Sequence, residues 1–224
     1  MRIVDLTLGF YEGMPSYPAE WYPQFSMQQV MTPETDPAGT GRTFTQLRIF
    51  PHNGTHIESA FHFFHDRETL DQVPLETFIG RACVADLSDK APLDPVTADD
   101  IAAAVDDVWQ EGDRLLVRTD YLRDHWGSAD YWDRPPYLTL SAAEWAVAHG
   151  ASMVGLDCLT ERPGDTESPV HRRLLDNGIP ILEYLSNLHA LREREVFLVA
   201  LPTSVKGTEA APARAVAFDG WTPG

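Results

Sequence analysis

The segment 51–65 reads Pro51-His52-Asn53-Gly54-Thr55-His56-Ile57-Glu58-Ser59-Ala60-Phe61-His62-Phe63-Phe64-His65, and it contains four of the eight histidines of this chain. Even numbers of residues separate three of these histidines and one glutamate, so in extended or locally looped chain their side chains project to one side: His52, His56, Glu58 and His62. On a helix, Glu58 would turn away from His52. Imidazole and carboxylate groups suit zinc or manganese, and Gly54 lets the backbone bend tightly. The segment therefore predicts a metal site at the edge of a strand.

The same residues also have a purely structural interpretation, in which the histidines are hydrogen-bonded residues at the edge of an apolar core. Phe61, Phe63 and Phe64 lie beside His62 and favour that interpretation for a single histidine. Burying several titratable groups together is costly unless an ion compensates their charges. Three histidines and a glutamate at this spacing therefore favour the metal site.

The composition predicts one globular domain that spans residues 1–224. With 43% hydrophobic and 23% charged residues, a chain of this length can fill one core. The formal net charge of −17 argues against nucleic-acid binding, which needs Lys and Arg to replace phosphate counterions, and favours a small-molecule partner. The acidic residues are spread along the sequence, which predicts a solvated surface: they include Glu34, Asp36, Asp99–Asp100, Asp106–Asp107 and the segment Glu161–Glu167.

The N-terminal sequence Met1–Leu6 lacks the long apolar stretch of a secretion signal, and no segment approaches the length that spans a bilayer. We therefore expect a cytoplasmic protein that does not bind membranes. Cys83 and Cys158 lie in apolar runs far apart in the sequence, and this arrangement predicts buried free thiols instead of a disulfide.

Short apolar runs predict strands, and helical segments alternate with them in the second half of the chain. Strands are expected from Arg2 onward and at Thr43–Phe50, Arg81–Ser88, Arg114–Thr119, Met153–Asp157 and Val196–Leu201. Thr97 and Ser141 each stand three residues before an acid, as in a capping box, and predict two helix starts. The mixture indicates an α/β or α+β domain rather than a doubly wound sheet.

Two further candidate metal ligands occur much later in the sequence. His171 stands at the start of a short predicted helix that Gly178 ends, and Glu183 is an acid within an apolar predicted strand. A buried acid needs a partner of opposite charge. The local pattern leaves two partners open for Glu183, namely a metal ion or a base such as Arg172 or Arg173.

The sequence resembles the cyclase superfamily of metal-dependent hydrolases, which includes bacterial kynurenine formamidases and isatin hydrolase. The hallmark string of that family, His-x-Gly-Thr-His-x-Asp-x-Pro-x-His-Phe, here reads His52-Asn-Gly-Thr-His56-Ile-Glu58-Ser-Ala-Phe-His62-Phe63. The opening segment, Asp5-Leu-Thr-Leu-Gly-Phe-Tyr-Glu-Gly-Met-Pro-Ser-Tyr-Pro18, and the later segment 171–188 resemble the family in the same order. The resemblance implies a swivelling β/β/α fold, a homodimer or homotetramer, and one or two metal ions, with Zn²⁺ expected first and Mn²⁺ second.

The resemblance also implies a set of metal ligands. His52 and His56 would bind the first ion, and His171 would bind the second. Glu58 and Glu183 would bridge the two ions. Glu58 departs from the family pattern, in which this position is usually Asp, and its additional methylene group alters the reach of the carboxylate.

A catalytic histidine and a substrate contact follow from the same resemblance. His62 matches the family's catalytic histidine, and Tyr17 falls where formamidases often carry a tryptophan that contacts the aromatic substrate. Phe63 is a further candidate for substrate binding. Aromatic residues near the motif predict a wall for a flat substrate, although we expect at least half of them to pack in the core: Tyr17, Trp21, Tyr22, Phe61, Phe63 and Phe64.

These observations predict a metal-dependent hydrolase of an amide, lactam, lactone or ester bond in a small, aromatic substrate, similar to kynurenine formamidase. A metal ion would activate water, and His62 would transfer the proton. Two alternatives remain open from the sequence. One is a cyclase or dehydratase in aromatic, polyketide-type biosynthesis, and the other is a small-molecule-binding homologue without catalytic activity.

Overall fold

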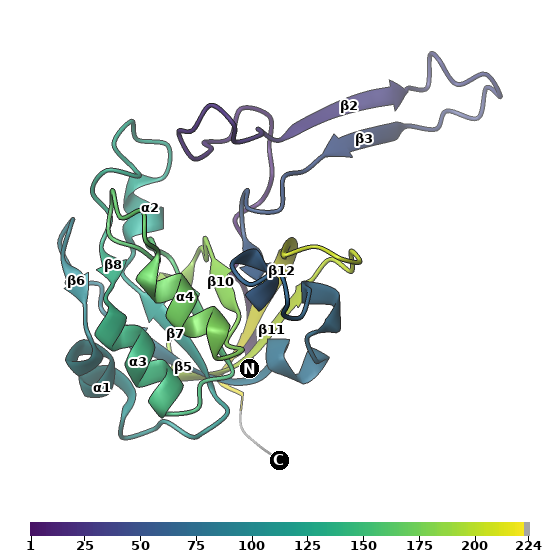
Figure 1. The fold of residues 1–224 in the computed structure, drawn as a ribbon. Coiled ribbons are helices and arrows are strands. Elements are labelled where there is room, and N and C mark those ends of the chain that lie inside the picture. Colours follow the sequence, from purple (N-terminus) through teal and green to yellow (C-terminus); the bar gives the residue numbers. More distant parts are fainter. Residues whose placement is uncertain (222–224) are drawn as a thin grey trace.

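In the computed structural model, which describes residues 1–221, the main element is an eight-stranded mixed sheet (Figure 1). Its strands are β1 (Arg2–Asp5), β4 (His56–Glu58), β5 (Ile79–Asp86), β7 (Arg114–Arg118), β9 (Met153–Leu156), β10 (Ile181–Glu183), β11 (Glu195–Pro202) and β12 (Ala210–Asp219). They lie in the order β1-β12-β11-β5-β7-β9-β10-β4, and β5, β7, β9 and β10 run parallel to one another. The mixture of parallel and antiparallel strands, with helices between them, confirms the predicted α/β class.

The sheet closes on itself because β4 pairs with β10 along one edge and with β12 along the other. The interior of this ring is filled by buried apolar side chains, among them Ile57 of β4. β12 supplies small side chains at alternate positions, which lets the opposing strands approach closely: these are Ala211, Ala213, Ala215 and Ala217. The closure holds β4, the middle of the histidine-rich segment, between two strands from the end of the chain.

Helices cover the outer face of the parallel strands (Figure 1). They are α1 (Ala98–Val105), α3 (Leu140–Ala148) and α4 (Pro169–Asp176), whereas the short α2 (Tyr121–His125) lies beyond the ends of the strands. Thr97 caps α1 in a capping box, as predicted. The predicted start of α3 at Ser141 is wrong, because Thr139 is the N-cap residue and accepts a hydrogen bond from the Ala142 amide. The Ser141 hydroxyl instead accepts from the amide of Ala98, at the start of the neighbouring helix.

Several short elements connect the strands and helices of the body. They are the two-residue parallel strands β6 (Pro95–Val96) and β8 (Tyr137–Leu138), and the 3₁₀ helices η1 (Ala60–His62), η2 (Leu70–Gln72), η3 (Leu75–Phe78) and η4 (Leu188–Ala190). Within residues 1–221, every helix is too short or too polar to cross a membrane. Cys83 and Cys158 are both buried and free, as predicted.

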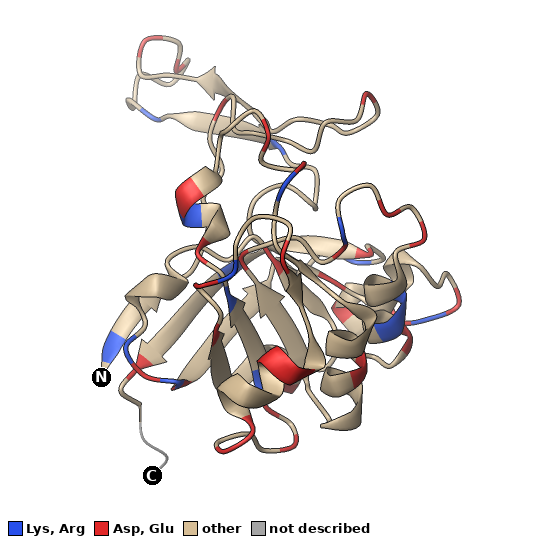
Figure 2. Ribbon diagram, turned by 90° about the vertical axis from the view of Figure 1, so that its left-hand side faces the viewer, with Lys and Arg blue, Asp and Glu red and all other residues tan. Residues whose placement is uncertain are grey.

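The antiparallel strands β2 (Ser26–Met31) and β3 (Phe44–Arg48) form a hairpin that projects from the body of the protein and that we call the arm (Figure 1). Asp36 organises the loop at its tip. The buried carboxylate accepts hydrogen bonds from the Ala38 amide at 3.0 Å, from the Thr40 amide at 2.9 Å and from the Arg42 guanidinium at 3.2 Å. Acidic residues lie on many surface segments of the protein (Figure 2), but the prediction of a solvated side chain is wrong for Asp36.

We expect the tip of the arm to lose its conformation at acidic pH. Hydrogen bonds from Thr40 and Arg42 hold the pKa of the Asp36 carboxyl well below its ordinary value of 3.8. The ionised carboxylate therefore stabilises the loop above about pH 4, and this contribution is lost as the pH falls through the lower pKa of the folded state. Hydrogen exchange should show protection of the Ala38 and Thr40 amides at pH 7 and a loss of protection below pH 4.

The variant Asp36→Asn should show the same loss of protection at pH 7, because an amide side chain cannot accept from all three donors. Glu34→Gln, in the same loop, is the matched control and should retain the protection of the parent protein. Equal protection in Asp36→Asn and the parent would show that the carboxylate does not hold the loop.

Candidate metal centre

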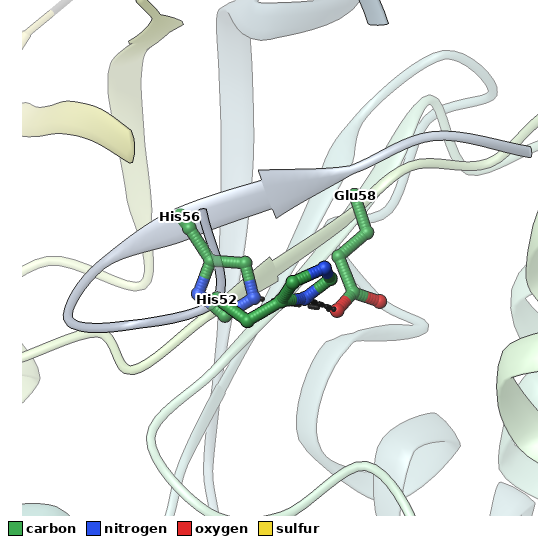
Figure 3. Close-up of side chains that lie close together, drawn as sticks. All are labelled: His52, His56 and Glu58. Carbon is green, nitrogen blue, oxygen red and sulfur yellow. Dashed lines mark hydrogen bonds and ion pairs between the residues drawn. The ribbon is translucent and has the colours of Figure 1, made fainter. Parts of the chain in front are cut away.

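The extended backbone of β4 places His56 and Glu58 on one side of the chain (Figure 3). Ile57 between them points to the other side, into the apolar core. Gly54, with a φ of 62°, turns the preceding segment back so that His52 faces the same two residues. Nδ1 of His52 lies 2.7 Å from Oε1 of Glu58, and Nε2 of His56 lies 3.3 Å from the same oxygen. The even spacing seen in the sequence thus corresponds to one cluster in space.

The two later candidate ligands complete the cluster from the opposite side. β10 pairs with β4 so that Glu183 lies directly opposite His56, and directly paired residues share one face of a sheet. His171, in the first turn of α4, places its Nε2 atom 3.4 Å from Oε2 of Glu58 and 3.5 Å from Oε1 of Glu183. All five predicted ligands are therefore brought together, and Glu183 faces histidines instead of Arg172 or Arg173.

The five side chains form two groups that share Glu58. Donor atoms of His52, His56 and Glu58 all lie within 4.8 Å of one another, and so do donor atoms of Glu58, His171 and Glu183. Each group thus offers three donor atoms, the number of protein ligands that is typical of a catalytic metal site. One shared carboxylate, with an oxygen facing each group, is the arrangement of a bridging ligand.

Glu58 is only 2% exposed, and its Oε2 atom is buried without a hydrogen-bond partner among the described residues. Burial raises the pKa of this carboxyl, but the imidazoles of His171, His52 and His56 outweigh burial and hold the pKa well below its ordinary value. An ionised, buried oxygen without a donor is costly unless a cation lies nearby. The set of nitrogen and carboxylate donors, with this unpaired oxygen between them, fits a divalent metal ion.

Polar groups around the cluster orient its members, and sequence reasoning did not identify them. Nδ1 of His171 lies 3.0 Å from Oε1 of Glu161, which also accepts the His171 amide at 2.9 Å. Thr160 donates a hydrogen bond to Glu183. The prediction of a solvated surface is wrong for Glu161, because its carboxylate is largely buried against His171. Thr160 and Glu161 lie about 100 residues after the motif in the sequence. Their contacts with the cluster are therefore visible only in the folded structure.

His62 lies beside the cluster but belongs to neither ligand group. It ends η1, its side chain is 29% exposed, and its Nε2 atom is 3.9 Å from Oε1 of Glu58. Its ring centre lies 4.7 Å from that of His52. Burial lowers the pKa of His62, which favours the neutral imidazole. A neutral imidazole at this distance can accept or donate a proton without occupying a ligand position.

The cluster forms one wall of a cavity of about 550 Å³. The aromatic residues that line it are Tyr17, Trp21, Tyr22, Phe50, Phe61, Phe63, Trp132 and Tyr184. Tyr17 and Phe63, the two predicted substrate contacts, are among them. The expectation that at least half of the six aromatic residues near the motif would be core residues is wrong. Two of the six, Phe63 and Phe64, pack against the core, and Phe63 also lines the cavity. The cavity has the size and lining of a small-molecule site.

Comparisons with known proteins identify relatives along the whole chain. A family model described as "Putative cyclase" matches residues 4–161. The chain is 31% identical over 230 aligned residues to a kynurenine formamidase of Salinibacter ruber, with 100% of both chains covered. It is 26% identical to a kynurenine formamidase of Bordetella petrii, with 96% of this chain and 97% of that protein covered.

Solved structures give the same fold. A protein described as a potential metal-dependent hydrolase with cyclase activity superposes with a TM-score of 0.80 at 28% identity, covering 99% of both chains. Isatin hydrolase A from Labrenzia aggregata superposes with a TM-score of 0.86 at 24% identity, covering 97% of this chain and 93% of that one. The similarity to the isatin hydrolase concerns the fold alone.

We expect a divalent ion to stabilise the folded protein, because it binds the assembled cluster and not the unfolded chain. At a free Zn²⁺ concentration of 100 times the dissociation constant, the gain is about 2.7 kcal/mol, which raises the melting temperature by several degrees. Thermal unfolding with and without Zn²⁺ measures this gain.

Glu58→Gln removes the charge that both ligand groups share, so most of the gain should disappear in this variant. Glu144→Gln, on the exposed face of α3, is the matched control and should keep the full gain. If Zn²⁺ stabilises Glu58→Gln as much as the parent protein, the ion binds elsewhere.

Proposed function

The chain belongs to the cyclase family, and on that premise we propose that it is a metal-dependent hydrolase that cleaves the C–N bond of an amide in a small aromatic substrate, as in an N-formyl aryl amide. One observation carries the proposal: two ligand groups share the buried Glu58 at the wall of an aromatic cavity, and His62 stands beside them. This arrangement combines a place for a cation, a proton carrier and a surface for a flat ring.

We propose Zn²⁺ as the metal, with one or two ions per chain, and Mn²⁺ as the second choice. His52 and His56 would hold one ion and His171 the other, with Glu58 and Glu183 between them. Three histidines favour zinc, whereas two carboxylates also suit manganese. When bound, a divalent ion supplies a Lewis acid for a carbonyl oxygen and lowers the pKa of a water molecule to about 7.

His62 transfers the proton during hydrolysis. Its imidazole accepts a proton as the oxygen of water bonds to the carbonyl carbon. It then donates that proton to the leaving nitrogen as the C–N bond breaks, so the products are a carboxylic acid and an amine. The position of His62 on the cavity wall, outside both ligand groups, leaves its ring free for this transfer.

The aromatic wall orients the substrate. Tyr17 packs edge-on against Trp132, with ring centres 6.4 Å apart, and Phe63 lies next to His171 with ring centres 5.6 Å apart. A flat ring that packs between these side chains brings its substituent to the cluster, since Phe63 is adjacent to both His62 and His171. The orientation of the ring by Tyr17 and Phe63 is part of our proposal.

The two alternatives from the sequence gain less support. The relatives that cover the whole chain are named as formamidases, which favours hydrolysis over a cyclase or dehydratase reaction. A binding protein without activity would not require a proton carrier, whereas here His62 lies beside all five candidate metal ligands. N-formylkynurenine is therefore the first substrate to test.

His62→Ala should lower kcat for N-formylkynurenine hydrolysis by about a hundred- to ten-thousand-fold, because the proton transfer loses its carrier. The metal content should stay at the parent level, since His62 is not a ligand. Steady-state kinetics and elemental analysis of the same preparations measure both quantities. Chelation of the metal should abolish turnover in the parent protein.

His189→Ala, which changes an exposed histidine on η4, is the matched control and should keep parental activity. Parental turnover in His62→Ala would contradict the assigned role. A parent protein with bound metal but without activity on any aryl formamide, lactam or lactone would contradict the proposed function.

We also propose that the chain forms a homodimer or homotetramer and that the arm contributes to the interface. The arm exposes large apolar side chains with 42% to 56% of their surface accessible: Met27, Val30, Phe44, Leu47 and Ile49. Its two strands contain no acidic residue (Figure 2), whereas the whole chain has a net charge of −17. Two copies of a chain with a net charge of −17 repel each other electrostatically, and this repulsion is weakest between surfaces without acidic side chains. The apolar strands of the arm are such a surface.

Leu47→Glu should therefore lower the molar mass measured by light scattering towards that of one chain. Leu47 is paired with Met27, so the new charge enters one apolar face of the arm. Gln46→Glu adds the same charge to the opposite face of the same strand and is the matched control. A parent protein that is monomeric at every concentration, or equal masses for both variants, would contradict this interface.

A further inference from the structure

Each imidazole in the cluster has one ring nitrogen directed at Glu58 or Glu183 and the other nitrogen engaged by an acceptor. Nδ1 of His56 donates to the carbonyl of Gly54 at 2.9 Å. Nδ1 of His171 meets Glu161, as described above. Nε2 of His52 lies 3.0 Å from Oε1 of Glu209. The first two partners come from segments next to the ligand in sequence, but Glu209 is 157 residues away from His52.

His52 is the ligand that secondary structure supports least. His56 is part of β4 and His171 is part of α4, whereas His52 lies in the connection between β3 and β4. Its backbone is fixed by the Tyr22 hydroxyl, which donates to the His52 carbonyl at 2.6 Å. This bond does not fix the rotation of the ring. The carboxylate of Glu209 is the group that contacts the outer edge of that ring.

Glu209 is itself held in place by its backbone. Its carbonyl accepts hydrogen bonds from the amide of Ser59 at 2.8 Å and from the Ser59 hydroxyl at 3.0 Å. The next residue, Ala210, is paired with Glu58 in the sheet. These contacts join the start of β12 to the histidine-rich segment through the main chain of Glu209 and Ala210. The Glu209 side chain takes no part in them, and its carboxylate contacts His52.

We propose that Glu209 is a positioning residue of the metal centre, which fixes the tautomer and the ring orientation of His52. By accepting the Nε2 hydrogen, the carboxylate keeps the His52 proton on the outer nitrogen. With an ion bound, this tautomer would leave the lone pair of Nδ1 available as a ligand on the side of Glu58, whose Oε1 atom lies 2.7 Å from Nδ1 in this structure. A carboxylate behind a ligating histidine also makes the imidazole a stronger ligand. This inference rests on the proposed function only in requiring that the cluster binds a divalent ion.

Glu209→Ala should weaken the binding of Co²⁺ and Zn²⁺ by about ten- to a hundred-fold, the usual effect of losing such an outer partner. Glu209→Gln retains an oxygen that can accept the Nε2 hydrogen, so it should recover part of that affinity. Competition against a chromophoric chelator measures the affinity. The visible spectrum of the Co²⁺ protein should shift in Glu209→Ala, because the orientation of a ligand changes. Glu144→Ala is the matched control.

A purely structural role for Glu209 predicts a different result, namely a lower melting temperature of the metal-free protein with an unchanged Co²⁺ spectrum. That result, or parental metal affinity in Glu209→Ala, would overturn the proposal. The outcome is independent of catalysis. A protein that hydrolyses no amide but loses metal affinity in Glu209→Ala would contradict the proposed function and support the role of Glu209.

Discussion

The structure of the site depends on one buried carboxylate. Glu58 is almost inaccessible, three imidazoles surround it, and one of its oxygens has no donor among the described residues. Such a group is tolerated only where a positive charge compensates it, and the compensating charge here is best supplied by a divalent ion. Glu58 also links side chains from two distant segments of the chain, since it belongs to both ligand groups. Because Glu58 belongs to both groups, a change in the reach of its carboxylate would alter both of them at once.

Closure of the sheet brings these segments together. β4 is only three residues long, yet it pairs with β10 and with β12, and each neighbour contributes to the site. Glu183 is placed directly opposite His56, and Glu209 precedes the residue that pairs with Glu58. The small alanine side chains of β12 permit the ring to close around Ile57. The same strand pairings therefore produce both the apolar packing inside the ring and the cluster of candidate metal ligands outside it.

The sequence predicted the side chains that cluster in the candidate metal centre better than it predicted the polar groups around them. Even spacing in segment 51–65 identified three of the five candidate ligands, because alternation along a strand is a local property. His171 and Glu183 were found from a helix start and an acid in an apolar strand, and the choice of partner for Glu183 needed the pairing of β10 with β4. Glu161 and Glu209 could not be predicted, since an acid next to a loop has the same local sequence whether it is solvated or bonded to histidine. Long-range contacts of this kind have no signal in a single sequence.

The most direct measurement is anomalous diffraction from a crystal grown with Zn²⁺, recorded on both sides of the zinc absorption edge. The account predicts one or two anomalous peaks beside Glu58, with imidazole nitrogens of His52, His56 or His171 at about 2.0–2.1 Å from an ion. It would be contradicted by zinc that binds only at other sites, with the five side chains of the cluster bonded directly to one another.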